Sequence, residues 1–312
     1  MDNRNDIREF LASRRARITP QQAGLPAFGG GKRRVPGLRR EEVAMLAGVS
    51  VDYYGRLERG ELNGVSDSVL DALAGALQLD EAERSHLFDL ARVANTVPRA
   101  RARAARRKAA QQVRPGVQYM LDAMTDSAAV VLNNRLDVIA GNQLGKALYA
   151  PLFAAPQHGA NIARLTFLDP RAADIYPNWD AVADNTVAAL RTEAGRTPYD
   201  KGLTDLVGEL STRSEEFRVR WAAHHVYLHR CGTKQFHHPQ VGDLTLLFEV
   251  LPLPSDPGLS MTAYVAEPGT PAHDSLKLLA SWAATRDNAT ALQEEDEQEE
   301  ASSADAPGAQ RP

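Results

Sequence analysis

The residues with the clearest chemical potential lie in the segment RREEVAMLAGVSVDYYGRLERG, residues 39–60. Within it, the guanidinium group of Arg56 can donate two parallel hydrogen bonds to O6 and N7 of guanine. Tyr53 can donate to a phosphate oxygen or pack on a thymine methyl group. Asp52 can accept from N4 of cytosine or cap the start of a helix. These side chains are suited to contacts with base pairs in the major groove of DNA.

Two short helices joined by a tight turn would hold these side chains outward. Gly48 is placed to end the first helix, because glycine adopts the positive φ that such a turn requires. Ser50 is a good N-cap for the second helix, and Tyr54 and Leu57 are spaced to form its buried face. The residues left facing outward are Val51, Asp52, Tyr53 and Arg56.

The pattern AxxxGVSxxxYxxLERG, residues 44–60, resembles the signature of the lambda-repressor-like (XRE-type) helix-turn-helix regulators. The longer stretch PGLRREEVAMLAGVSVDYYGRLERG is similar to a subfamily common in actinobacterial regulators. The resemblance implies that Arg39 and Arg40 lie against the sugar-phosphate backbone of DNA. It also implies that the DNA-facing positions of the recognition helix are Ser50, Val51, Asp52, Tyr53 and Arg56.

The same resemblance assigns a structural role to Glu58, which is expected to pair with Arg14 or Arg15 of the first helix. One departure from the family is the length of the connection between its first two helices. Here that connection, residues 19–37, is long and rich in glycine and proline. This connection carries three basic residues, Lys32, Arg33 and Arg34. They either contact phosphates of the DNA or are simply solvated.

Charge is divided unevenly along the chain. Residues 1–114 carry 21 Lys and Arg against 14 Asp and Glu, whereas the whole chain has a net charge of −4. A basic N-terminal portion indicates a polyanionic partner. Residues 99–108, RARARAARRK, form either a second phosphate contact or a solvated linker helix.

Helical periodicity predicts an all-α N-terminal module of five short helices, the first over residues 4–17 and the last capped by Asp80. After residue 115 the pattern changes to a helix over 117–124 and a hairpin around Asn133-Asn134-Arg135, followed by a helix capped by Asn142. Helices are expected over residues 161–222 and 272–284. The expected strands are residues 224–230, 244–253 and 261–267, so this half is α+β with an antiparallel sheet.

The second half resembles the ligand-binding domain of MmyB-like transcription regulators, a PAS-like fold, from about residue 113 to 283. The stretches that carry the resemblance include LDVIAGN, NIARLTFLDPRA, NWDAVADNTVAALR and GTKQFHHPQVGDLTLLFEVL. It implies a sensor of small molecules, for which apolar, fatty-acid-like ligands are the usual suggestion. Aromatic side chains here form either core or a ligand cavity, and the candidates are Trp179, Phe217, Trp221, Phe236, Phe248 and Tyr264.

The sequence gives weaker support for a metal site, a disulfide or a catalytic site. Five histidines cluster in residues 224–238, and His225 and His229 would share one strand face, yet no carboxylate or thiol has metal-ligand spacing. His224 and His238 match framework positions of the resembled domain. Cys231 is the only cysteine, which excludes an internal disulfide and favours a buried or incidental thiol. No catalytic motif is present, so we expect neither enzyme activity nor a cofactor.

The sequence therefore predicts four regions. These are a helix-turn-helix DNA-binding domain (1–95), a basic linker (96–114), a PAS-like ligand-binding domain (115–285) and an acidic disordered tail (286–312). The charged N-terminus and the lack of a long apolar run favour a cytoplasmic protein with no membrane segment. We expect a homodimeric regulator that binds double-stranded DNA and a small ligand. The alternatives are a protein-interaction adaptor whose helical module binds the transcription machinery, and an enzyme or metal protein built on the acidic half.

Overall fold

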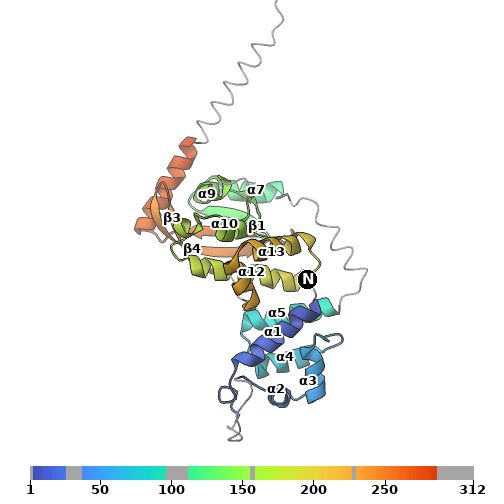
Figure 1. The fold of residues 1–312 in the computed structure, drawn as a ribbon. Coiled ribbons are helices and arrows are strands. Elements are labelled where there is room, and N and C mark those ends of the chain that lie inside the picture. The colour runs from blue at the N-terminus through green and yellow to red at the C-terminus, as the bar shows by residue number, and fades with distance from the viewer. Residues whose placement is uncertain (1–2, 26–36, 96–111, 155–158, 227–229, 287–312) are drawn as a thin grey trace, which may run out of the picture.

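The computed structural model describes residues 3–25, 37–95, 112–154, 159–226 and 230–286. The chain forms a helical part followed by a part built around a β-sheet (Figure 1). This confirms the predicted multidomain fold class, in which an all-α module precedes an α+β one. The predictions for Lys32, Arg33 and Arg34, for the basic stretch 99–108 and for the acidic tail lie outside the described residues.

Five helices form the helical part, and residues 3–25 and 37–95 contain no strand. The helices are α1 (Asn3–Arg17), α2 (Arg40–Leu46), α3 (Val51–Glu58), α4 (Asp67–Ala76) and α5 (Glu81–Ala94). Ile7, Phe10 and Leu11 recur on one side of α1 and are buried in a shared core. The predicted cap of α5 is confirmed, because the Asp80 side chain accepts a hydrogen bond from the backbone N–H of Glu83.

The connection between α2 and α3 has the geometry that the sequence predicts. Gly48 has a φ of +66°, and the Ser50 hydroxyl accepts from the backbone N–H of Tyr53 at 3.1 Å. Tyr54 and Leu57 are buried. Because its far side is anchored in the core, α3 projects its first turn outward.

A buried ion pair ties α3 to α1. The Glu58 carboxylate accepts from Nη2 of Arg15 at 2.7 Å and from Nε at 3.1 Å, and Arg40 lies 3.3 Å away. Burial alone would raise the pKa of Glu58, but hydrogen bonds from Arg15 and Arg40 outweigh it and lower this pKa overall. Of the two expected partners Arg15 is therefore the one found, whereas Arg14 pairs with Glu83 at 3.0 Å.

The second part is organised by an antiparallel sheet of five strands in the order β2-β1-β5-β4-β3, which confirms the predicted antiparallel sheet. The predicted hairpin is confirmed as β1 (Ala128–Asn133) and β2 (Val138–Gly141). The remaining strands are β3 (Cys231–His238), β4 (Gly242–Pro252) and β5 (Leu259–Val265).

The predicted strand over residues 224–230 is wrong. His224 has a φ of +53°, which lies outside the β region, so the backbone cannot be a strand at this position. Its ring contacts Glu9 of the helical part. Residues 227–229 lie outside the described residues. The strand begins at Cys231, whose thiol is exposed rather than buried.

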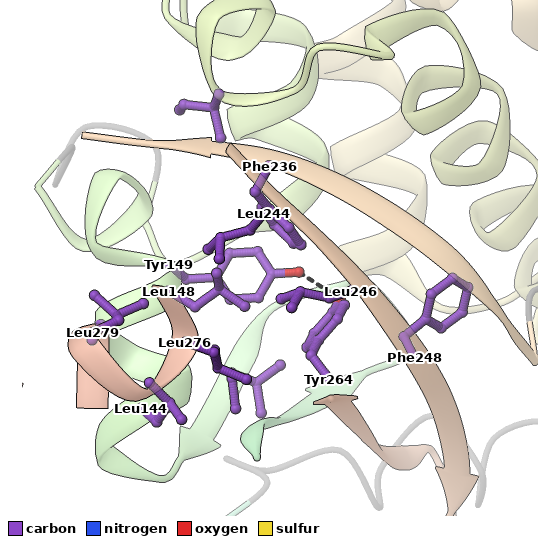
Figure 2. Packing of buried hydrophobic residues seen from close by; sticks show 14 of the residues in the cluster. Leu144, Leu148, Tyr149, Phe236, Leu244, Leu246, Phe248, Tyr264, Leu276 and Leu279 are labelled. Atoms are coloured by element: carbon purple, nitrogen blue, oxygen red, sulfur yellow. Dashed lines mark hydrogen bonds between the residues drawn. The ribbon is translucent and has the colours of Figure 1, made fainter. Parts of the chain in front are cut away.

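Helices cover the sheet on both faces. They are α7 (Pro115–Asp122), α8 (Gln143–Leu148), α9 (Ala150–Phe153), α10 (Ile162–Leu168), α11 (Ala172–Ile175), α12 (Trp179–Arg196), α13 (Lys201–Arg213), α14 (Glu215–Ala222) and a helix over 271–286. The larger core packs leucines of α8 and the 271–286 helix against Tyr149 and inward side chains of β3–β5 (Figure 2). On the opposite face α7 covers β1 and β5, so β1 is buried at every position. No described helix has both the length and the apolar character needed to cross a membrane.

We expect Glu58→Gln to lower the free energy of unfolding by about 3 kcal/mol at pH 7, because it leaves Arg15 without its counter-ion. The change is measured by urea denaturation of the full chain. A carboxylate whose pKa is lowered on folding stabilises above its unfolded pKa and loses this effect as the pH falls through the folded pKa. The difference between wild type and variant should therefore shrink below about pH 4.

The matched control is Asp71→Asn, which breaks an exposed pair with Arg84. It should cost less than about 1 kcal/mol at pH 7. Equal losses in the two variants would contradict the structural role assigned to Glu58.

Candidate DNA-binding face and sensor cavity

The start of α3 forms an exposed edge of the helical part. Val51 is 49% exposed, and Ser50, Asp52 and Arg56 are also exposed. Tyr53 is half-buried, with its ring packed against the helical core. The structure thus places the five predicted recognition residues on one short helix and its cap, with Ser50 to Tyr53 at the start of α3 and Arg56 in its last turn. A helix of this kind can enter a major groove.

Arg56 remains available for a partner outside the chain. Its guanidinium lies 5.3 Å from the centre of the Tyr53 ring, and it makes no hydrogen bond or ion pair with any described residue. Its N–H donors are therefore free for a base edge. Ser50 supplies the helix cap, which leaves the carboxylate of Asp52 as an acceptor or as a favourable charge at the positive end of α3.

The two arginines at the start of α2 differ in their ion-pair partners within the chain. Arg39 is exposed and contacts Glu41 at 3.3 Å. Arg40 is also more than half exposed, but it reaches the buried carboxylate of Glu58. Both are exposed cations that can pair with a phosphate group, and Arg40 also links α2 to α3 through Glu58.

A cavity of about 280 Å³ lies between α12 and the sheet. Its walls combine aliphatic side chains with amides and hydroxyls, and one cation is present among the lining residues. Those residues are Leu132, Leu136, Ile162, Asn178, Ala181, Val182, Asn185, Thr186, Ala189, Thr233, Lys234, Gln235, Phe248, Thr262 and Tyr264. Such a mixture suits a mainly apolar molecule with one polar end.

The predicted aromatic residues are divided between this cavity and the core. Phe248 and Tyr264 line the cavity, while Phe236 is buried beside it, 5.6 Å from the Tyr264 ring (Figure 2). Trp179 donates its indole N–H to the carbonyl of Thr166 at 2.9 Å. Phe217 and Trp221 stack on each other in a separate cluster formed with α10, α12 and α13.

Lys234 is the charged residue of the cavity lining, and it was not among the ligand-binding residues predicted from the sequence. It is half-buried on β3, and its Nζ lies 4.8 Å from the centre of the Tyr176 ring and 5.1 Å from that of Phe236. Burial lowers its pKa to about 7. The available signal was the spacing of two between Lys234, Phe236 and His238, which places all three on the inner face of β3.

The histidine cluster is dispersed in the structure. His238 is buried and its Nε2 lies 3.0 Å from the carbonyl oxygen of Ala147, whereas His237 contacts Asp243 at the surface. His229 falls outside the described residues. Within the described ranges, no three His, Cys, Asp or Glu side chains come together as a ligand set.

The two parts of the chain meet where α5 packs against α12 (Figure 1), and α1 contacts His224, which follows the end of α14. Asp89 of α5 pairs with Arg196 of α12 at 2.9 Å, and Glu9 of α1 contacts His224 at 2.8 Å. Arg14 donates to the backbone carbonyl of His224. These contacts join residues that are up to 215 positions apart in sequence.

The centre of this contact is sterically tight. A Cβ added to Gly195 would lie 2.4 Å from the ring of His86. His86 also meets Phe10 edge-on at 5.1 Å. Burial and the nearby charges of Arg191 and Arg14 lower the pKa of His86 to about 3, so this ring is neutral at pH 7.

Comparison with known families finds one match for each of the two parts of the structure. The family described as "MmyB-like transcription regulator ligand binding domain" matches residues 113–279, which is more than half of the chain. A helix-turn-helix domain family matches residues 7–87. No curated protein matches the chain. The two matches coincide with the sheet part and the helical part of the structure.

We expect Gly195→Ala to loosen the contact between the two parts without unfolding either, because the added methyl group collides with His86. Backbone amides of α5 should then exchange hydrogen faster in the full chain. Gly208→Ala on α13 is the matched control, since an added Cβ there meets no atom within 4 Å. Unchanged exchange in α5 for the Gly195 variant would show that the close approach does not hold the parts together.

Proposed function

Because the chain belongs to the MmyB-like transcription regulator family, we propose that it binds operator DNA as a homodimer and that a small apolar ligand alters this binding. Its matched domains make it a DNA-binding transcription regulator with a ligand-binding domain. We place such a regulator in the cytoplasm. The observation that carries the proposal is the exposed side of α3, where Val51, Asp52 and Arg56 are open to solvent and the Arg56 guanidinium makes no hydrogen bond or ion pair with a described residue. Arg39 and Arg40 on the same helical part are exposed cations that we assign to phosphates.

In this proposal, affinity and specificity come from different residues. Arg39 and Arg40 neutralise phosphates and release counterions, which contributes to binding on every sequence. Arg56 reads a guanine edge, with Tyr53 and Asp52 beside it. One such module contacts only a few base pairs, so two copies would bind half-sites about 10 base pairs apart, centre to centre.

The sheet part offers a surface that supports a dimer. Leu247 of β4 and Val265 of β5 are paired across neighbouring strands, and both are exposed, at 49% and 39%. Tyr119 of α7 is 73% exposed. Exposed apolar side chains on an outer sheet face favour burial against a second copy.

Helix α12 connects the ligand cavity to the DNA-binding part. Its first half lines the cavity through Ala181, Val182, Asn185 and Thr186. Its last turns carry Gly195 and Arg196, which contact α5. A ligand that displaces α12 would therefore shift the two readers of the dimer relative to each other, which supplies the coupling free energy between the two sites.

The lining of the cavity supports an apolar ligand with a hydrocarbon chain like that of a fatty acid. Leu132, Ile162, Val182 and Phe248 present hydrocarbon, and burying a chain against them gains about 0.8 kcal/mol for each CH₂ group. The amide and hydroxyl groups at the wall give such a ligand its orientation.

The experiment that tests the proposal mixes purified full-length protein with fragmented genomic DNA at about 0.15 M salt and sequences what is retained. We expect a sharp set of fragments that share a two-fold symmetric motif. Uniform retention that is lost with modest added salt would reject sequence-specific regulation and favour the adaptor, whose helical module binds a protein of the transcription machinery.

Two arginine substitutions separate readout from phosphate binding. Arg56→Ala should cost about 1–3 kcal/mol at one base position and relax specificity there, while Arg40→Ala should weaken binding to all sequences alike and reduce the salt dependence. Binding is measured by fluorescence anisotropy on the retained motif and on variants of it. The matched control is Arg84→Ala on α5, which pairs with Asp71 and should leave binding unchanged. Equal losses on every DNA sequence for Arg56→Ala and Arg40→Ala would contradict this division of roles.

A further inference from the structure

Lys234 is an amine held in an apolar environment without an acid beside it. No carboxylate among the described residues pairs with it, and the cavity lining contains no Asp or Glu. Aromatic rings of Tyr149, Tyr176 and Phe236 surround its Nζ, at 4.8–5.7 Å from their centres. Lys234 is also one of the residues that line the cavity, together with Tyr264.

Hydroxyl groups stand next to this amine. The Tyr149 hydroxyl lies 3.4 Å from Nζ and 2.6 Å from the hydroxyl of Tyr264, which itself lines the cavity. Burial raises the pKa of Tyr149, and it raises that of Tyr264 to about 12, so both keep their protons at pH 7. The hydroxyl of Tyr176, fully buried over the same amine, has no hydrogen-bond partner among the described residues.

We propose that Lys234 binds the carbonyl group of an apolar aldehyde or ketone covalently, as an imine, and that the cavity between α12 and the sheet is a carbonyl sensor. This rests on the proposed function, because it names the chemical class of the ligand at the same site. A nucleophilic lysine requires a neutral amine within reach of the carbonyl carbon and a proton donor for the carbonyl oxygen. Lys234 and the hydroxyl pair of Tyr149 and Tyr264 meet both requirements.

The reaction is a condensation that needs no oxidant or reductant. The lone pair of Nζ forms a bond to the carbonyl carbon, and the carbonyl oxygen becomes a hydroxyl by taking a proton from the tyrosine pair. Nitrogen then gives up both of its protons: one restores the tyrosine pair, and the other passes through this pair to the hydroxyl, which leaves as water while a C=N bond forms. The products are one imine and one water molecule, and hydrolysis by the reverse steps releases the ligand.

The electrostatics of the site favour a carbonyl over a carboxylate. An amine with a pKa of about 7 is about half neutral at pH 7, whereas an exposed lysine is neutral in fewer than about one molecule in a thousand. A carboxylate would have to be desolvated together with a charged amine in this apolar wall, at a cost that one ion pair does not reliably offset. An imine is formed from two neutral groups and avoids that cost.

The test traps the imine in the full-length protein. Purified chain is incubated with decanal and sodium cyanoborohydride at pH 7, and the intact mass and the labelled peptides are then measured. The chain has six lysines, so the modified position is assigned without ambiguity. We expect a gain of one decyl group on Lys234, at a rate at least about tenfold higher than on any other lysine, because of its larger neutral fraction.

Two variants define the site. Lys234→Met keeps an apolar side chain of similar length and should lose the fast label, while Lys201→Met, which removes an exposed lysine of α13, should keep it. Thermal melting verifies that each variant is folded. The wild-type peptide map decides the question even if Lys234→Met does not fold.

Label spread evenly over the lysines, or slow label on Lys234, would overturn the proposal. Decanoate that binds tightly in a Lys234-dependent way, with no trapping of decanal, would overturn it in favour of a carboxylate counter-ion. DNA retention by the untreated protein is measured in parallel. Specific DNA binding without trapping rejects only the carbonyl site, and trapping without specific DNA binding rejects only the regulator.

Discussion

The arrangement of the two parts depends on the packing of α5 against α12. His86 and Gly195 approach too closely for any larger residue, and Asp89 and Arg196 pair beside them. Asp89 is 4% exposed, so opening the contact halfway would leave its carboxylate buried without Arg196. Such an interface favours two discrete states, joined or separated, over a continuum of intermediate positions.

Helix α12 is a wall of the cavity and a face of that interface at once. Its 18 residues form a single rigid element, and packed interiors deform little. A shift imposed near Val182 therefore has to be accommodated near Gly195. The same geometry explains why α12 needs small residues at both ends of its inner face: Ala181 leaves space for a ligand, and Gly195 leaves space for the histidine ring.

The arginines of the helical part fall into two groups: some form ion pairs that hold the fold together, and others are available to a partner outside the chain. Arg15 is committed to the buried carboxylate of Glu58, and Arg14 is committed to Glu83 and to the sheet part. Arg56, only two residues from Glu58 along the chain, makes no such pair with the described residues. Because the structural acids are already neutralised, they do not compete with phosphate for the outer cations.

The sequence by itself determined the helices, their caps and the helix-turn-helix, because these depend on contacts between near neighbours. The φ of Gly48, the caps at Ser50 and Asp80, and the hairpin of β1 and β2 all follow from local residue types. Tertiary structure alone decided where β3 begins, which aromatic residues reach the cavity, that the Lys234 amine lies among aromatic rings, and that His86 is buried. Those outcomes depend on contacts between separate segments, such as His86 with Gly195 and Lys234 with Tyr176, and spacing along one segment carries no signal for them.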